Sequence, residues 1–314
     1  MKKGIGILLL IGLIWGISYY RNDGKGRPVL VTIAPGQSGS SAAKQLKSRG
    51  IIRSQSLFKL ALKLNGGLPA GSFDLRPKMS EFQALKCMKD GRCTHYEKIT
   101  FLEGWRSEEM AEELASHSIT DGNEFLRMVR QQKLEGHLFP STYLFTLNMP
   151  AKKVVQEMTA QYEKNIRPLF TQYPSKLTEQ QVLTLASIVE REAVLADEKP
   201  KIAAVYLNRF EIGKRLEADP TVQYALGYDL GSNRYWKKRL LFKDLKIDSP
   251  YNTYRRSGLP PGPICNPSAA SVQAVLRPTP NFNALYFVAD SGGRHVFARH
   301  YDEHQRNIKR IRGQ

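Results

Sequence analysis

The segment "TEQQVLTLASIVEREA", residues 178–193, carries the clearest helix signal in the chain and ends with two glutamates. Its opening Thr-x-x-Gln fits a capping box, and apolar residues then recur at the spacing of one helix face. At roughly 100° per residue, Glu190 lies about 40° from Ala186, inside the apolar face, and Glu192 lies about 120° away on the other side. We therefore expect Glu190 to be buried and Glu192 to be a solvated charge.

A carboxyl group on a buried helix face needs a physical reason, because burial disfavours its charged form. Desolvation raises the pKa of a carboxyl group, so a buried Glu190 would keep a proton near neutral pH and could act as an acid. The wheel is also compatible with a structural Glu190 that is paired with an arginine or caps another segment. The helix pattern does not separate these two hypotheses.

The charge of the chain indicates an anionic partner. The 314 residues include 47 Lys and Arg against 29 Asp and Glu, a formal net charge of +18. Such a surplus favours nucleic acid, anionic lipid or an acidic polymer outside the membrane, without choosing among them. With 41% hydrophobic and 24% charged residues, the chain has a globular composition rather than a disordered one.

The N-terminus, "MKKGIGILLLIGLIWGISYY", predicts a membrane anchor over residues 1–27 with its linker. The run Gly4–Tyr20 has no charge and sits at the short end of what a spanning helix needs. A cleaved signal peptide is the alternative, but no small-x-small cleavage site follows the run. Charge alone leaves the orientation open, because lysine or arginine residues flank both ends.

Three cysteines give little information. Cys87, Cys93 and Cys265 do not have the spacing of a zinc site. Cys87 and Cys93 bracket the turn-like "MKDGR", so a local disulfide is conceivable in an oxidising compartment, but we expect independent thiols. No cluster of metal-ligand residues is evident, and we expect neither a metal nor a cofactor.

A weak internal repeat follows the linker. "VTIAPGQSGSSAAKQLKSRGI" from Val31 and "ITFLEGWRSEEMAEELASHSI" from Ile99 align without gaps, with Gly36 matching Gly104. Each copy predicts a short strand, a glycine turn and an amphipathic helix. Two copies are too few for a solenoid. We therefore predict an α+β chain with a module at 28–98 and a larger domain at 99–314, whose first part, near 99–132, is the second copy.

The larger domain also shows distinct elements. "KPKIAAVYLNRFEIG" predicts a helix after the glutamates, and "ALYFVADSGGRHVFAR" predicts a hairpin with a Ser-Gly-Gly turn. Between them, residues 211–280 lack a regular pattern but are rich in Pro, Gly, Asn and Tyr. Long segments of this kind inside a domain are usually functional or disordered, and these aromatics and turns argue against disorder.

Ordered motifs in this domain resemble one family. "LEGHLFPSTY", "ASIVERE", "AAVYLNR", "LEADPTVQY", "SPYNTY", "GLPPGPICNP" and "LYFVADSGGRHVF" together resemble the endolytic murein transglycosylases of the MltG (YceG-like) family. The likeness covers nearly the whole chain after the anchor, and the repeat resembles the family's LysM-like region. Ser141, Glu217-Ala218 and Ser268 depart from the usual pattern, which puts the substrate contacts in more doubt than the reaction.

The resemblance implies a single-pass protein of the cytoplasmic (inner) membrane whose catalytic domain faces the cell wall. It would cut peptidoglycan glycan strands internally between N-acetylmuramic acid and N-acetylglucosamine, leaving 1,6-anhydro ends and terminating nascent strands. The family's catalytic glutamate carries over to Glu190. Peptidoglycan, the membrane and the synthases of the elongation machinery are the implied partners, and nucleic acid is not.

Further polar residues of these motifs are candidates for binding the glycan. Asp219, Thr221 and Gln223 could bind sugar hydroxyls or orient Glu190, and Asp219 before Pro220 is equally compatible with a capped turn. The remaining candidates are Asn208, Tyr251, Asn252, Thr253, Tyr254 and Asn266. Tyrosines packed beside a loop are the alternative for the 251–254 stretch.

Two rival functions remain open at this level. The first is a muramidase that hydrolyses the same bond with Glu190 as acid and Asp219 as its partner. The second is a non-catalytic peptidoglycan-binding anchor that uses the repeat and the basic surface. Nucleic-acid binding rests on charge alone, since no recognition-helix pattern is present.

Overall fold

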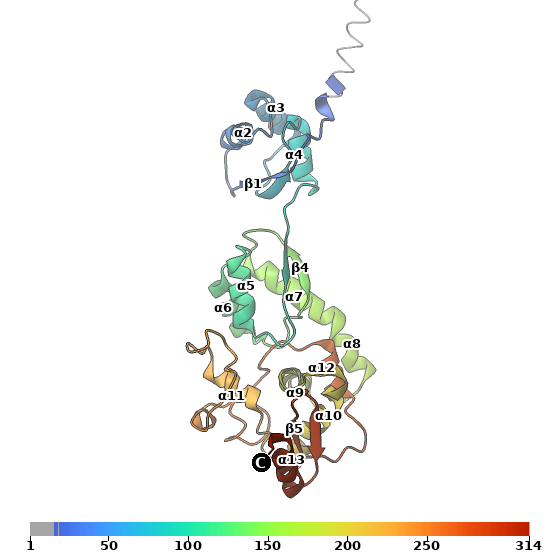
Figure 1. The fold of residues 1–314 in the computed structure, drawn as a ribbon. Coiled ribbons are helices and arrows are strands. Elements are labelled where there is room, and N and C mark those ends of the chain that lie inside the picture. The colour runs from blue at the N-terminus through green and yellow to red at the C-terminus, as the bar shows by residue number, and fades with distance from the viewer. Residues whose placement is uncertain (1–15, 18, 314) are drawn as a thin grey trace, which may run out of the picture. The chain divides into compact units, whose positions relative to one another are not determined.

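The structure is a computed structural model that describes residues 16–17 and 19–313 (Figure 1). Among these residues, no helix is both long and apolar enough to cross a membrane. Most of the predicted anchor lies outside the described residues, so the anchor stays a prediction. The described chain is mixed α+β with short two-stranded sheets, which confirms the expected fold class, and it divides into two units.

The first unit comprises the described residues up to Lys98, with His117–Ile119 and Leu144–Met149. Its elements are β1 (Val29–Ile33), α2 (Gly39–Ser48), α3 (Gln55–Asn65), β2 (Gly71–Leu75) and α4 (Glu81–Lys89). β1 and β2 pair antiparallel, with Val31 opposite Phe73. The alternating side chains of β1 and the apolar faces of the three helices close one hydrophobic core.

Cys87 and Cys93 of this unit form a disulfide, so the prediction of independent thiols is wrong for this pair. The left-handed turn at Gly91, with φ of +78°, returns the chain after α4 and brings the two Cα atoms to 5.4 Å. Cys265 is free and buried, as an independent thiol would be.

The internal repeat is real at the level of local structure. β1 and α2 form the first copy, and β3 (Glu97–Thr100) and α5 (Ser107–Ser116) form the second. The matched glycines, Gly36 and Gly104, both have positive φ, at +74° and +79°. A left-handed turn therefore joins strand to helix in each copy, which explains why glycine occupies both positions.

The second unit comprises Ile99–Ser116, Thr120–Tyr143 and the chain from Pro150 onward. Its further elements are α6 (Gly122–Gln132), α7 (Ala151–Asn165), α8 (Arg167–Gln172), α9 (Glu179–Glu192), η1 (Ala196–Glu198), α10 (Lys199–Glu211), α11 (Asp219–Leu226), η2 (Asp244–Lys246), α12 (Ala269–Leu276), β5 (Tyr286–Ala289), β6 (His295–Ala298) and α13 (Tyr301–Arg312). Strand β4 (Thr142–Phe145), which pairs with β3, is divided between the two units after Tyr143. The predicted helix after the glutamates is α10, and the predicted hairpin is β5–β6.

α9 lies at the centre of the second unit (Figure 1). Thr178 and Gln181 form the predicted capping box at its start. The helix packs against α10, α11 and α12, and every residue from Val182 to Val189 is buried. α9 is therefore enclosed on all sides along most of its length, and the expectation of one buried face and one solvated face is wrong.

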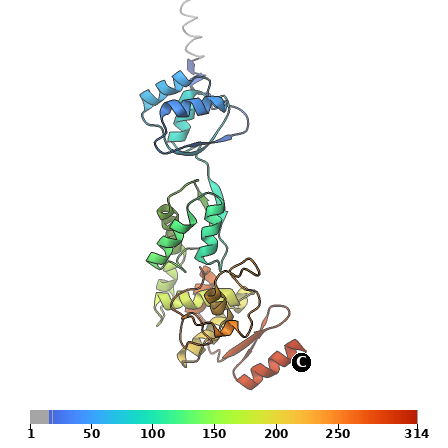
Figure 2. The same cartoon turned by 90° about the vertical axis from the view of Figure 1, so that its left-hand side faces the viewer.

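The β5–β6 hairpin and α13 lie together at one end of this unit (Figure 2). The chain between α10 and α12 is irregular apart from two short helices, as the sequence predicts. Its 216–219 stretch and Tyr254 help to line a cavity beside Glu192, and a hydrogen bond from Ala218 to Thr253 joins the two parts of this chain.

Candidate active site

Glu190 is held in a closed polar cluster. Lys199 donates to its Oε1 at 2.9 Å, and the backbone N–H and the hydroxyl of Ser268 donate to its Oε2 at 2.9 and 2.5 Å. The Glu190 side chain is 7% exposed and that of Lys199 is 9% exposed. Burial raises the pKa of Glu190, but the bonds from Ser268 and the charge of Lys199 outweigh it, so the pKa lies below its ordinary value.

Glu190 is thus an ionised carboxylate with its partners in place. The expectation that burial keeps it neutral is wrong, because the sequence pattern on one helix cannot reveal the ammonium and hydroxyl supplied by α10 and the start of α12. The role of Glu190 as the catalytic acid is a separate prediction. The surroundings of Glu192, the second glutamate at this end of α9, must be compared with those of Glu190.

Glu192 has the surroundings that were expected for Glu190. Its one side-chain hydrogen-bond partner in the described structure is Tyr206, whose hydroxyl donates to Oε1 at 2.7 Å. Burial raises the pKa of Glu192 to about 7, the bond from Tyr206 acts in the lowering direction, and the negative charge of Asp219 raises it further. The prediction of a solvated Glu192 is wrong, because α10 and the 216–219 stretch cover that side of α9.

A cavity of about 260 Å³ opens beside Glu192. It is lined by Glu192, Tyr206, Arg209, Leu216, Glu217, Asp219, Tyr254, Tyr286, Phe287, Tyr301 and His304. Asp219 is exposed at the start of α11 and accepts a hydrogen bond of 2.6 Å from the hydroxyl of Tyr254. A proton-holding carboxyl, a second carboxylate and several aromatic rings therefore face one cavity, which is the equipment that glycosidic bond cleavage uses.

Arg209 holds together the segments that surround this cavity. Its guanidinium donates to the carbonyls of Leu285 and Leu216 at 2.6 and 2.7 Å and to Glu217 at 3.1 Å. It also lies 5.0 Å from the ring centre of Tyr286. Arg209 therefore joins α10 to both flanking segments and keeps the cavity's aromatic wall in place.

The sequence reasoning missed Tyr206, Arg209 and Glu192 as site residues, although all three stand in recognised motifs. Tyr206 and Arg209 are three residues apart, a spacing that puts them on the same face of α10. That spacing was the available signal. It could not be used without knowing that α10 packs beside the end of α9.

Of the predicted glycan contacts, Asp219 and Tyr254 line the cavity with Glu192. Four others are buried: Thr221, Asn252, Thr253 and Asn266. Thr253 accepts from the backbone N–H of Ala218 at 3.0 Å and lies 2.8 Å from the Thr221 hydroxyl, and Asn252 donates to two backbone carbonyls. The polar atoms of these four side chains bond to other parts of the protein and are buried, and their direct contact with sugar stays a prediction.

Asn208 and Gln223 also hold backbone. The amide of Asn208 donates to the carbonyls of Phe282 and Ala284 at 2.7 and 2.9 Å, and that of Gln223 donates to the carbonyl of Lys237 at 2.8 Å. The structure does not bring these two amides to the Glu192 cavity. Their hydrogen bonds hold the segments around Phe282–Ala284 and Lys237.

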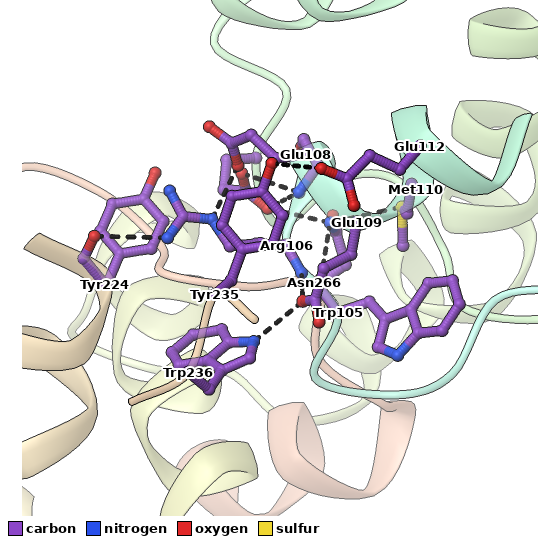
Figure 3. A network of polar contacts seen from close by, with 12 residues as sticks. Trp105, Arg106, Glu108, Glu109, Met110, Glu112, Tyr224, Tyr235, Trp236 and Asn266 are labelled. Atoms are coloured by element: carbon purple, nitrogen blue, oxygen red, sulfur yellow. Dashed lines mark hydrogen bonds and ion pairs between the residues drawn. The ribbon is translucent and has the colours of Figure 1, made fainter. Parts of the chain in front are cut away.

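Asn266 belongs to a separate polar network (Figure 3). Its Oδ1 accepts from the backbone N–H groups of Gly136 and Leu138 at 2.9 Å, and its Nδ2 donates to Glu135 and to the carbonyl of Trp105. In the same view Arg106 lies over the ring of Tyr224, 4.2 Å from its centre. This network ties the turn before α5 to the segments around 135 and 266.

Tyr251 lines a second cavity, of about 340 Å³, together with Glu135 and Tyr224. Burial raises the pKa of Glu135 to about 7, so a high pKa alone does not identify the acid. However, Glu135 accepts from the Ser107 backbone N–H with both oxygens and from Asn266 with one. Glu135 is thereby engaged in holding the fold, whereas Glu192 has one partner and a second carboxylate in its cavity.

Among residues 16–17 and 19–313, no group of three or more His, Cys, Asp or Glu side chains could hold a metal ion.

Comparison with known proteins gives relatives of one kind. Residues 31–310 match the model of the YceG-like family. A protein of Bacillus subtilis (strain 168) named endolytic murein transglycosylase is 31% identical over 307 residues, covering 88% of this chain and 83% of that protein. A protein of the same name from Streptococcus pneumoniae (strain D39) is 28% identical over 321 residues, covering 89% of this chain and 58% of its own length.

A solved crystal structure is also similar to this chain. The 2.6 Å crystal structure of a YceG-like protein from Listeria monocytogenes is 30% identical in sequence, with a TM-score of 0.57. The match covers 90% of this chain and 100% of that one. The likeness therefore extends over both units.

Proposed function

Since the chain belongs to the YceG-like family, we propose that it is an endolytic murein transglycosylase whose acid is Glu192, in place of the Glu190 that the motif suggested. The observation that carries this proposal is the pKa of Glu192, which is raised to about 7 beside a cavity that also contains Asp219. Glu190 is ionised and fully engaged, so it has no proton to give.

The reaction needs one group that first gives and then takes a proton. Protonated Glu192 donates its proton to the oxygen that links N-acetylmuramic acid to N-acetylglucosamine. The bond between that oxygen and C1 of the N-acetylmuramic acid breaks at the same time. The C6 hydroxyl of the same muramic acid then attacks C1, and the Glu192 carboxylate takes the hydroxyl proton. The glutamate is restored, no water is consumed, and the product carries a 1,6-anhydro bridge.

The other side chains of the cavity have supporting roles in this reaction. Burial keeps Glu192 protonated and the negative charge of Asp219 adds to this effect, while Tyr254 fixes the direction of the Asp219 carboxylate through the 2.6 Å hydrogen bond. Tyr286 and Tyr301 offer rings against which the apolar face of a sugar can pack. Tyr206 orients the Glu192 carboxyl itself.

Hydrolysis is the closest competing reaction, because Asp219 gives the cavity a second carboxylate. The mass of the products separates the two. Purified glycan incubated with the full chain should yield muramic acid ends that are lighter by one water than those made by lysozyme. Products with hydrated reducing ends would establish a muramidase instead.

The pH dependence should report Glu192. Since the reactive form is protonated and its pKa is about 7, kcat/KM for glycan cleavage should be level below that pH and fall about tenfold per unit above it. Asp219→Asn removes a charge that raises this pKa, so the fall should begin at lower pH. Tyr206→Phe removes a bond that lowers it, so the fall should begin at higher pH.

Glu190→Gln serves as the control for this profile, since Glu190 is engaged with Lys199 and Ser268. Its profile should keep the wild-type midpoint. A midpoint that moves in Glu190→Gln and stays in the other two variants would return the role of the acid to Glu190.

The location and the smaller module belong to this proposal as well. We propose that residues 1–27 anchor the protein in the cytoplasmic membrane as a single pass, with the enzyme on the outer side, and that 28–98 is a LysM-like module for glycan. The Cys87–Cys93 disulfide supports an oxidising compartment. Contact with elongation synthases and a preference for nascent strands rest on the family resemblance alone.

A further inference from the structure

A basic loop with exposed apolar residues lies outside the active site. The segment Lys237–Lys246, "KKRLLFKDLK", follows α11. Phe242 is 88% exposed and Leu241 is 44% exposed, although most large apolar side chains of this unit are buried. Two neighbouring apolar side chains this open to water indicate a surface that is covered by something else.

The loop has a defined conformation. The buried carboxylate of Asp244 accepts from the Leu241 backbone N–H at 2.7 Å and from the Lys237 ammonium at 2.8 Å. A short 3₁₀ helix, η2, follows directly. These bonds close a tight turn whose tip is Leu241-Phe242-Lys243, so the exposure of the two apolar residues is built in.

The charge around the tip is of one sign. Between residues 230 and 247 the chain carries Arg234, Lys237, Lys238, Arg239, Lys243 and Lys246, and its single acidic residue is Asp244. Lys237 neutralises that carboxylate. Lys238, Arg239 and Lys243 are exposed, and within the described chain none of them forms an ion pair.

We propose that this loop docks onto the surface of an anionic lipid bilayer, with Leu241 and Phe242 entering the headgroup region and the three exposed cations binding lipid phosphates. Large apolar residues between lysines and arginines suit an anionic bilayer interface, whereas lysine is depleted from protein–protein interfaces. The chain's own uncharged run Gly4–Tyr20 would tether the protein to a bilayer, so the inference rests on the anchor proposed above.

Docking of this loop would affect the active site. Asn252 donates to the carbonyls of Leu245 and Ile247 at 2.9 and 2.8 Å, and its own Oδ1 accepts from the Tyr254 backbone N–H at 3.0 Å. Tyr254 in turn holds Asp219 in the Glu192 cavity. The loop therefore supports Tyr254, which positions the carboxylate of Asp219 in the cavity. A loop docked on the bilayer would keep Tyr254 in this position.

The test uses the full chain in nanodiscs of phosphatidylcholine, with or without phosphatidylglycerol. Phe242→Cys carries a bimane label at the tip, and lipids with a nitroxide on the acyl chain quench a label that enters the bilayer. Cys265 is buried and the other two cysteines are joined, so labelling is selective. Leu102→Cys, exposed beside Glu103, is the matched control.

We expect strong quenching at position 242 in anionic discs, weak quenching in phosphatidylcholine, and none at position 102. Each cation near an anionic surface shifts such an equilibrium about fivefold, so changing Lys238, Arg239 and Lys243 to Gln should lower the docked-to-free ratio about 100-fold. Equal quenching at 242 and 102, or quenching that ignores both lipid charge and the triple substitution, would overturn the proposal.

Failure of the docking proposal can be distinguished from failure of the anchor proposal. If the full chain does not incorporate into discs, the anchor proposal fails, and flotation of the then soluble chain with the same two vesicle types measures the loop directly. Binding to anionic vesicles that is lost in the triple variant supports the docking loop. No flotation with either vesicle type overturns it.

Discussion

Replacing Glu192 with glutamine is expected to lower the rate of glycan cleavage by at least ~10²–10⁴-fold, the usual share of general acid–base catalysis. The change keeps the size of the side chain and removes the proton that the leaving oxygen needs. Both half-reactions fail together, because the same carboxyl gives and takes the proton. The measurement is release of anhydro muramic acid ends from purified glycan, normalised to folded protein.

The same variant should be more stable than the wild type. The folded protein holds the Glu192 proton to about pH 7, whereas an unfolded glutamate loses it near 4.5. Ionisation therefore costs the folded state stability that grows between these pH values and is complete above them. At pH 8, Glu192→Gln should gain about 3 kcal/mol in denaturant unfolding, and the gain should vanish below pH 4.5.

The matched control is Glu190→Gln, two residues earlier on α9. It should lose stability, since Lys199 is left buried without its ionised partner, but each folded molecule should keep cleavage within about tenfold of wild type. A folded Glu190→Gln that makes no anhydro ends, beside an active Glu192→Gln, would refute the assignment and restore the one made from the motif.

Replacing Lys199 with methionine is expected to destabilise the second unit by about 3–5 kcal/mol at neutral pH, because Glu190 then remains buried without its cation. In this variant Glu190 can recover by taking a proton. The loss should therefore shrink as the pH is lowered toward the pKa of the now unpaired carboxyl. Urea unfolding can be followed by tryptophan fluorescence, since two of the three tryptophans of the chain, Trp105 and Trp236, belong to this unit.

The double variant Glu190→Gln, Lys199→Met closes a thermodynamic cycle. Two neutral side chains of similar volume should recover most of the stability that each single change loses, since the main cost is an isolated charge. Additive losses would mean that the two residues act independently and that the 2.9 Å contact does not hold the end of α9 to α10.

Local features of the fold were predictable from the sequence. The capping box at Thr178, the hairpin around the Ser-Gly-Gly turn and the glycine turns of the repeat all appear as expected, because each depends on residues close together in the chain. Helix α3 was missed. It bears three exposed leucines, Leu57, Leu60 and Leu64, which blur the apolar stripe that marks a helix in sequence.

The roles of the two glutamates were not predictable, because they depend on residues far away in the chain. A helical wheel for α9 predicts burial from the position of a residue relative to one apolar face. In the structure, α10, α11 and α12 pack against the helix from several sides. Which carboxyl keeps a proton is then decided by whether Lys199 or Tyr206 lies opposite it. The same holds for Thr221 and Thr253, whose mutual hydrogen bond joins residues 32 apart in the sequence.

Four hydrogen bonds of the Asn266 side chain have a consequence for the order in which the protein can fold. They join positions 128 to 161 residues apart in the sequence, so the network cannot close until the chain has been synthesised past residue 266. Contacts of such long range form late and slowly during folding. Glu135, which lines the second cavity, therefore gains its hydrogen bond from Asn266 only when most of the chain is present.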